Sequence, residues 1–528
     1  MPKVLISDQL SPAAIDVFKQ RGIEAVVKPG LTPAELRAII GAFDGLAIRS
    51  ATKVTRELLD AATNLKVIGR AGIGIDNVDV KSATARGVVV MNTPYGNAIT
   101  TAEHAIGLMF ALARQLPEAS ASTKAGKWEK NRFMGVELTN KTLGLIGAGN
   151  IGSIVADRAV GLKMRVVAYD PYLTEARATV LGIEKVELDT LLARADFITL
   201  HTPLTEQTRN ILSRENLAKT KKGVRIVNCA RGGLIDETAL YDALQSGHVA
   251  GAALDVFEVE PATASPLFAL ENVVCTPHLG AATTEAQENV ALQVAEQISD
   301  FLLTGAVTNA VNMASVSAED APRLKPYMQL CQLLGSFAGQ LTEARHGVIT
   351  KVGIEYEGAA AHLNHRPLSA ALFAGLLAPM MEGVNMVNAP VFARDHGIDM
   401  SETVHDRDSE YQTLVRISVT TGDQTRTVSG TLFGGAKPRL VEVKGIKVEA
   451  DFGRHMLYVT NQDKPGFIAR CSAILAEKNI NIATFHLGRA SEGGDAVCLI
   501  SIDETLPEAA LVAIRALPQV MQATQLAF

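Results

Sequence analysis

Three ionisable side chains from separate stretches of the chain could together perform acid–base chemistry on an anionic substrate: Arg231, Glu260 and His278. A histidine titrates near neutrality, so it can take a proton from a hydroxyl group and return it. An arginine stays charged and grips a carboxylate through two parallel N–H groups. A glutamate on the far imidazole nitrogen fixes the tautomer and stabilises the imidazolium, so the two groups titrate as a pair.

Each of these residues alone also fits an ordinary structural role. His278 follows Pro277 and could cap a strand, Glu260 precedes Pro261 in what could be a solvated turn, and Arg231 could pair with a helix terminus. All three, however, lie at or just past the ends of predicted strands. Ligands of doubly wound sheets bind beyond the carboxyl ends of the strands. We therefore predict that the three side chains share one site.

A glycine-rich turn predicts a dinucleotide-binding site in the second part of the predicted sheet region. Gly147-Ala148-Gly149-Asn150-Ile151-Gly152 follows the apolar run 143–146 and opens a helical pattern, and Asp170 lies eighteen residues past Gly152. The glycines would make a tight turn, admit a pyrophosphate and allow close helix packing. Asp170 would bind the adenosine ribose and repel a 2′-phosphate, which favours NAD over NADP. A glycine turn alone is a weak signal, and a tight turn with a solvated Asp170 is the alternative reading.

Two lobes of alternating strands and helices must position these groups. The first lobe contains the expected strands Val4–Ile6, Ala25–Val27, Leu46–Ile48, Lys66–Ile68 and Val88–Met91. The second contains Leu143–Ile146, Arg165–Tyr169, Phe197–Leu200, Arg225–Val227, Ala250–Leu254 and Val273–Cys275. A helix over 101–116 should lead into the second lobe, and a helix over 284–304 should return the chain to the first. We expect a flavodoxin-like first lobe and a Rossmann-like second lobe.

Two further blocks follow a linker at 315–322. Residues 323–450 combine Leu/Ala-rich helices with strands around Val415–Val419 and Leu440–Val443, separated by the turn Gly434–Lys437. This α+β block contains no catalytic constellation. Residues 454–528 follow a βαββαβ order, which is typical of a ferredoxin-like fold.

Composition narrows the classes of partner. A chain of 528 residues should form three or four domains, and a net charge of −6 without a long basic run argues against nucleic acid. No apolar stretch reaches about 18 residues, so no membrane partner is expected. The five scattered cysteines show no metal-ligand spacing, which predicts no metal site and reduced thiols. The first residues lack a signal-peptide layout, and we expect a cytoplasmic protein.

Three motifs resemble signatures of the D-isomer-specific 2-hydroxyacid dehydrogenases: 228–236, 254–261 and 276–280. The resemblance implies that Arg231 clamps the substrate carboxylate, that His278 is the acid/base and that Glu260 is its partner. It implies NAD as cofactor, with Asp255 holding the nicotinamide amide. The cofactor-binding residues predicted from the turn and the resemblance are Gly147, Gly149, Asn150, Ile151, Gly152, Asp170, Thr202, Cys229, Ala230, Asp255, Gly280 and Ala281.

Within that family, segments 49–53 and 69–77 and the two C-terminal blocks resemble the long-form D-3-phosphoglycerate dehydrogenases. The implied reaction is oxidation of D-3-phosphoglycerate with NAD, the first step of L-serine biosynthesis. The implied substrate-binding residues are Arg49, Ser50, Arg70, Ala71, Gly72, Ile73 and Asn97. The implied domains are a substrate domain (1–97 and 287–314), a NAD domain (98–286), an intervening regulatory domain (318–450) and an ACT domain (454–528).

The ACT resemblance further implies allosteric control and self-association. We expect L-serine to bind near Asp463 and Asn481, although both could be ordinary turn residues. A homotetramer, or at least a dimer through the nucleotide lobes, is the implied assembly.

Two other readings stay open. Relatives that act on glyoxylate, hydroxypyruvate or another 2-hydroxy acid usually end near the helix that returns to the first lobe, whereas this chain continues for about 210 residues. A NAD-sensing corepressor built on the same fold would be expected to carry a disordered tail, and this tail instead has folded patterns.

Overall fold

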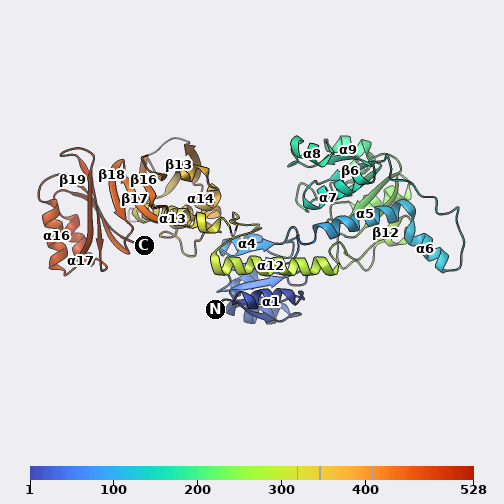
Figure 1. Ribbon diagram of the computed structural model, residues 1–528, viewed down its shortest axis with the longest axis horizontal. Helices are drawn as coiled ribbons and strands as arrows, with labels where there is room; N and C mark the ends of the chain where they lie inside the picture. Colours follow the sequence, from blue (N-terminus) through green and yellow to red (C-terminus); the bar gives the residue numbers. More distant parts are fainter. Residues whose placement is uncertain (318, 344–346, 406–409) are drawn as a thin grey trace.

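The computed structural model describes residues 1–317, 319–343, 347–405 and 410–528. It shows an elongated arrangement of four regions, each built on its own sheet (Figure 1). The second lobe lies at one end and the C-terminal domain at the other, with the first lobe and the third block between them. No helix within the described ranges has both the length and the apolar character that a bilayer crossing needs.

The first lobe is a five-stranded parallel sheet in the order β2-β1-β3-β4-β5. Its strands are β1 (Lys3–Ile6), β2 (Glu24–Val27), β3 (Gly45–Ile48), β4 (Val67–Arg70) and β5 (Val89–Asn92). Helices α1 (Ala13–Gln20), α2 (Pro33–Ile39), α3 (Arg56–Ala61) and α4 (Val80–Ala85) join them. This strand order is flavodoxin-like, as predicted.

The second lobe is a seven-stranded parallel sheet in the order β12-β11-β10-β9-β6-β7-β8. Its strands are β6 (Thr142–Ile146), β7 (Arg165–Tyr169), β8 (Glu184–Lys185), β9 (Phe197–Leu200), β10 (Val224–Asn228), β11 (Val249–Leu254) and β12 (Val273–Cys275). Its main helices are α7 (Asn150–Gly161), α8 (Glu175–Leu181), α9 (Leu188–Arg194), α10 (Arg214–Ala218) and α11 (Glu237–Gln245). The strand order reverses between β6 and β9, and such a switch point is where doubly wound folds bind nucleotides. Strand β8 was not predicted because it is two residues long and charged.

Two helices join the lobes. Helix α5 (Ala98–Arg114) stops at Gln115, whose φ of 51° ends the predicted helix early, and α6 (Leu116–Lys124) starts there in a new direction. Helix α12 (Thr284–Thr304) packs its buried Val290, Val294 and Ile298 against the sheet of the first lobe. Both helices line the cleft between the lobes, α5 through Thr101 and α12 through Ala286 and Val290.

The third block contains a larger sheet than predicted, in the order β14-β13-β15-β16-β17-β18. Its strands are β13 (Ile349–Gly358), β14 (Asp399–His405), β15 (Thr413–Thr421), β16 (Gln424–Phe433), β17 (Lys437–Val443) and β18 (Ile446–Asp451). Helices α13 (Ala321–Glu343), α14 (His365–Leu377) and α15 (Ala389–Asp395) accompany it. The 434–437 turn lies where it was predicted and joins β16 to β17, but strand β16, between the two expected strands, was not predicted. Strand β14 was missed because it is an exposed edge with few apolar residues.

Helices α13 and α14 touch through glycines, and this contact predicts a stability effect. A Cβ added at Gly375 would lie 2.0 Å from the carbonyl oxygen of Gln332, and one at Gly335 would lie 2.1 Å from that of Leu372. Backbone cannot yield cheaply, so we expect Gly375→Ala to destabilise the protein by about 1–3 kcal/mol in urea unfolding. Gly161→Ala at the end of α7 meets no atom within 4 Å and is the control. Equal unfolding midpoints for the two variants would contradict this packing.

The C-terminal domain has the predicted ferredoxin-like order of elements. Its strands are β19 (His455–Gln462), β20 (Ile482–Arg489), β21 (Asp495–Ile502) and β22 (Val520–Ala527), in the sheet order β20-β21-β19-β22. Helices α16 (Phe467–Glu477) and α17 (Glu508–Arg515) cover one face. Tyr458, Val497 and Leu526 on the other face join the core of the third block.

Candidate active site

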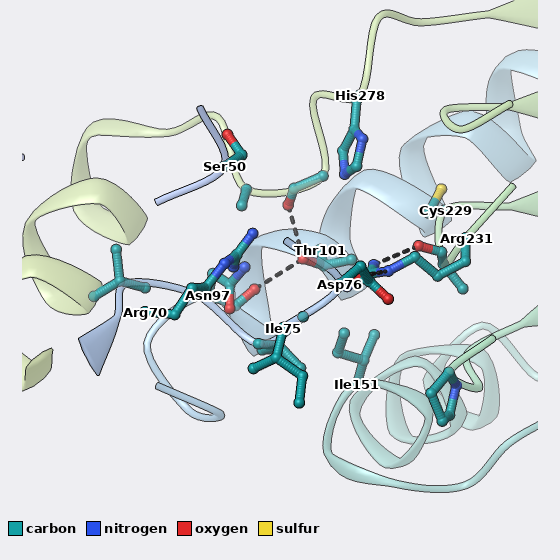
Figure 2. Close-up of a pocket in the computed structure, with 18 of the residues that line it drawn as sticks. Ser50, Arg70, Ile75, Asp76, Asn97, Thr101, Ile151, Cys229, Arg231 and His278 are labelled. Atoms are coloured by element: carbon teal, nitrogen blue, oxygen red, sulfur yellow. Dashed lines mark hydrogen bonds and ion pairs between the residues drawn. The ribbon is translucent and has the colours of Figure 1, made fainter. Parts of the chain in front are cut away.

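A cleft of about 790 Å³ lies between the two lobes and collects side chains from both (Figure 2). Arg231, Glu260 and His278 all line it, as do all the predicted substrate-binding residues. Of the predicted cofactor residues, those on the cleft wall are Asn150, Ile151, Thr202, Cys229, Ala230, Gly280 and Ala281. Parallel strands bring their carboxyl ends to one edge, which is why residues so distant in sequence converge here.

His278 and Glu260 form the expected pair. The Nδ1 atom of His278 lies 2.7 Å from Oε2 of Glu260, and Oε1 of Glu260 accepts a hydrogen bond from the Phe257 N–H at 3.0 Å. The hydrogen bond to Glu260 raises the pKa of His278 above its ordinary value, although burial opposes this. Burial acts to raise the pKa of Glu260, but the bonds from His278 and Phe257 outweigh it and leave that pKa below its usual range. Glu260 can stabilise a proton on the imidazole through Nδ1. The Nε2 atom of His278 is then available to a ligand in the cleft.

Arg231 follows β10 in a short loop tied by Asn228. The Asn228 side chain donates to the Arg231 carbonyl at 2.9 Å and accepts from the Ala230 N–H at 3.0 Å. The guanidinium donates from Nη1 to the Ala230 carbonyl at 2.7 Å and from Nε to Oδ2 of Asp76 at 2.9 Å. Asp76 belongs to the first lobe, so this ion pair bridges the cleft.

Asp255 lies beneath the cleft rather than on its wall. Its carboxylate is fully buried and accepts hydrogen bonds from the Thr276 hydroxyl at 2.6 Å, the Leu279 N–H at 2.7 Å and the Gly280 N–H at 2.8 Å. His104 Nε2 lies 3.2 Å away. Burial opposes ionisation, but these partners leave the pKa of Asp255 below its ordinary value. What the structure shows for Asp255 is an anchor for the segment that carries His278.

The glycine turn has the geometry expected of a dinucleotide cradle. Gly147 has φ +95°, and a Cβ there would lie 2.6 Å from the His201 carbonyl oxygen. A Cβ on Gly149 would meet nothing within 4 Å, whereas one on Gly152 would lie 2.1 Å from the Gly147 carbonyl oxygen. The first glycine thus permits the turn, the second leaves space for a phosphate before the N-terminus of α7, and the third lets the helix pack closely. These residues fit NAD.

Asp170 closes the same turn. Its Oδ2 accepts from the Ala148 N–H and its Oδ1 from the Tyr172 N–H, both at 2.8 Å. The carboxylate sits where β7 ends, next to the glycine turn, which is the position expected of a ribose-binding acid.

The first lobe supplies a positive wall. Arg70 is largely buried, and its Nε is an enclosed donor without a partner among the described residues. Burial and then the nearby charge of Arg231 lower the pKa of Arg70 to about 10, so it stays charged at neutral pH. Arg49 also contributes repulsion. The loop beyond Arg70 is held by Thr93, whose hydroxyl accepts from the Gly72 N–H at 2.6 Å. A site that crowds guanidinium groups in this way is suited to a multiply charged anion.

Several cleft residues had been assigned no individual role from the sequence: Gly74, Ile75, Asp76, Thr101, His201, Pro203, Leu204, Ala282, Ala286 and Val290. Thr101 bridges the elements, since its hydroxyl lies 3.0 Å from the Asn97 carbonyl and 2.9 Å from that of Gly280 (Figure 2). Burial lowers the pKa of His201 to about 4, so that imidazole is neutral. The glycine-rich spacing of 72–76 was a signal for a ligand loop that could have included Asp76.

The two predicted effector residues lie at opposite ends of one strand. Gln462, beside Asp463, pairs with Asp495 at the start of β21, whereas Ile482, beside Asn481, pairs with Ile502 at its end. An eight-residue strand separates them by roughly 23 Å. Asp463 accepts from Arg489 at 2.8 Å, and Asn481 donates to Asp503 at 2.7 Å. Within one chain the two residues are therefore too far apart to contact the same small amino acid, and their role in effector binding stays a prediction.

Comparison with known families and proteins also indicates a NAD-binding 2-hydroxyacid dehydrogenase with two additional C-terminal domains. The NAD-binding domain of the D-isomer-specific 2-hydroxyacid dehydrogenases matches residues 106–280, the D-3-phosphoglycerate dehydrogenase intervening domain 323–444 and the ACT domain 455–519. D-3-phosphoglycerate dehydrogenase from Bacillus subtilis (strain 168) is 41% identical over 99% of this chain and 98% of its own length. The enzyme of that name from Methanocaldococcus jannaschii is 42% identical, over 98% of each.

Solved structures resemble the two lobes. TT0316 protein from Thermus thermophilus is 37% identical with a TM-score of 0.54, covering 58% of this chain and 99% of that one. D-lactate dehydrogenase from Aquifex aeolicus, complexed with NAD and lactic acid, is 26% identical with a TM-score of 0.53, covering 59% and 100%. With relatives of such identity over nearly its whole length, the chain belongs to the family of the D-3-phosphoglycerate dehydrogenases, within the D-isomer-specific 2-hydroxyacid dehydrogenases.

Proposed function

We propose that this chain oxidises D-3-phosphoglycerate to 3-phosphooxypyruvate with NAD, the first step of L-serine biosynthesis. The carrying observation is the 2.7 Å contact between His278 and Glu260 in a cleft that also holds Arg231 and Arg70. A base, a carboxylate clamp and a second buried cation match a substrate with a hydroxyl group, a carboxylate and a phosphate. The names of the relatives support the same substrate.

We assign each cleft residue a role in this reaction. Arg231 would bind the substrate carboxylate, with help from Asn97 and the backbone of 71–73, and Arg70 with Arg49 would bind the phosphate. Ser50 lines the same wall. NAD, when bound at the glycine turn, supplies the acceptor for the hydride from the substrate carbon. His278 would take the hydroxyl proton on Nε2, and Glu260 would stabilise the imidazolium that results.

Steady-state turnover tests the proposal. Purified protein should reduce NAD with D-3-phosphoglycerate faster than with D-lactate, D-glycerate or glycolate. The measurement is NADH formation, followed by the absorbance of the reduced nicotinamide. A preference for an unphosphorylated acid would overturn the substrate assignment, and tight NAD binding without any turnover would favour a binding protein.

The pH profile is a further prediction. Oxidation needs neutral His278, whose pKa is raised by Glu260, so the rate should be lost as pH falls through that raised pKa. The reverse reduction needs the imidazolium, so it should be lost as pH rises through the same pKa. Glu260→Gln removes the partner that raises the pKa, and the acid limb of kcat/KM should move to lower pH. An unchanged inflection would contradict the pairing.

Cofactor selectivity provides another prediction. Asp170→Ala removes the acid beside the ribose site and should raise the relative use of NADP, because the negative charge no longer opposes a 2′-phosphate. The ratio of kcat/KM for NAD and NADP is the measurement. Asp157→Ala on α7 removes an exposed acid of the same lobe and serves as the control. Equal ratios in the two variants would exclude the role given to Asp170.

We also propose a homotetramer, or at least a dimer, and regulation by L-serine. Trp128 is 87% exposed and Met134 74%, both just past α6, and a second copy would cover such apolar side chains. Because Asp463 and Asn481 are so far apart, an L-serine molecule that touches both must bridge two copies. Light scattering tests the assembly, and calorimetry with millimolar L-serine tests binding. The absence of binding heat would exclude L-serine as an effector.

The five free thiols fit a reducing compartment such as the cytoplasm.

A further inference from the structure

The ion pair between Asp76 and Arg231 is the feature that the proposed chemistry leaves unexplained. Oδ2 of Asp76 accepts from Nε of Arg231 at 2.9 Å. Asp76 lies in the loop after β4 of the first lobe, and Arg231 lies in the loop after β10 of the second. Figure 2 shows the two side chains meeting across the cleft.

Two protein oxygens already accept hydrogen bonds from the Arg231 guanidinium. Its Nη1 already donates to the Ala230 carbonyl at 2.7 Å. The Nε and Nη2 groups form one pair of parallel donors, and Asp76 holds Nε. Nη2 lies over Gly74, where an added Cβ would come within 1.7 Å of it. A substrate carboxylate that binds in two-pronged fashion through Nε and Nη2 must therefore displace Asp76 from the guanidinium.

The Asp76 carboxylate is exposed, so it can separate from Arg231 without losing burial. Its side chain is 65% exposed, and among the described residues Arg231 is the hydrogen-bond donor found for it. Asp8 in the same lobe is different, since its buried carboxylate accepts from the Arg49 N–H at 2.7 Å and from both the N–H and the hydroxyl of Thr52, at 3.1 and 2.6 Å. Asp8 is a structural acid, whereas the hydrogen bond found for Asp76 among the described residues comes from Arg231, beside the attractive charge of Arg70.

We propose that Asp76 is a positioning residue that holds Arg231 in the ligand-free cleft and yields it to the substrate carboxylate. This inference rests on the proposed role of Arg231 as the carboxylate clamp. The Asp76 carboxylate leaves the Arg231 guanidinium as the substrate carboxylate arrives. The guanidinium is therefore paired with one carboxylate before and after the exchange. The exchange also releases a contact between the lobes at the moment that substrate bridges them.

The kinetic test uses Asp76→Asn. Without the competing charge, the KM for D-3-phosphoglycerate should fall by about three- to fivefold, the size of one exposed ion pair. Asp76→Glu keeps the charge and should keep the wild-type KM. Glu258→Gln removes an exposed acid that does not line the cleft, and it should leave the KM unchanged. An unchanged or raised KM in Asp76→Asn would overturn the proposal, since a purely structural acid would give one of these.

A binding test separates exchange from a general change of charge. Calorimetry measures the dissociation constant of oxamate, a small carboxylate beside a carbonyl group, with NADH present. Asp76→Asn should tighten oxamate binding in the parent protein and have no effect in an Arg231→Gln background. The same tightening in both backgrounds would overturn the exchange. If the parent protein fails to oxidise D-3-phosphoglycerate, the proposed function fails, yet this binding cycle still decides the role of Asp76.

Discussion

His278→Asn is expected to lower the turnover of D-3-phosphoglycerate by about 10²–10⁴-fold, which is the usual contribution of a positioned acid/base. The imidazole is the cleft group paired with a carboxylate at 2.7 Å, and asparagine cannot take the hydroxyl proton. Asparagine is also suited to the backbone there, because His278 has φ 56° and asparagine tolerates that region. The loss should therefore reflect chemistry rather than unfolding. The measurement is kcat from initial rates at saturating NAD.

Cofactor binding is the companion measurement for this variant. The glycine turn lies on other elements, so the dissociation constant for NADH should stay within about twofold of the parent protein. His396→Asn, in the third block, replaces an imidazole that contacts the Phe392 carbonyl and is the matched control. Retained turnover in His278→Asn would exclude the assigned base, and parallel loss of NADH binding would point to a structural effect.

Arg70→Met should have the second largest effect, a loss of about 30-fold to 4 × 10³-fold in kcat/KM for D-3-phosphoglycerate. Methionine keeps a long apolar stem in the buried position but removes the charge. A buried charged partner of an anion contributes about 2–5 kcal/mol when truncated, and that energy sets the expected range. The Nε of Arg70 has no described protein partner, so the missing acceptor is expected to be the substrate phosphate.

Specificity distinguishes this role from general damage. D-Glycerate lacks the phosphate, so its kcat/KM should change much less than that of the phosphorylated acid in Arg70→Met. Arg56→Met at the start of α3 removes an exposed guanidinium in the same lobe and should behave like the parent protein. Equal losses for both substrates would show that Arg70 supports the fold of the cleft or holds the carboxylate instead.

Local pattern was enough to predict the two lobes. Their strands are short apolar runs that alternate with helical patterns, and parallel pairing makes each strand buried on both faces, so the signal is strong. The third block was harder. The edge strand β14 is mostly exposed, and its pairing with β13 depends on residues about fifty positions away, so no local pattern marks it.

The sequence by itself determined which residues can do the chemistry. Arg231, Glu260 and His278 each follow a strand of one parallel sheet, and the sheet places those ends at one edge. Only the tertiary structure showed which residues are in contact. Asp76 pairs with Arg231 from 155 positions away, and Asp255 is buried beneath the His278 segment. Asp463 and Asn481 lie at opposite ends of β21. Such contacts depend on how the lobes pack and on strand register, and neither is encoded in the local spacing of residues.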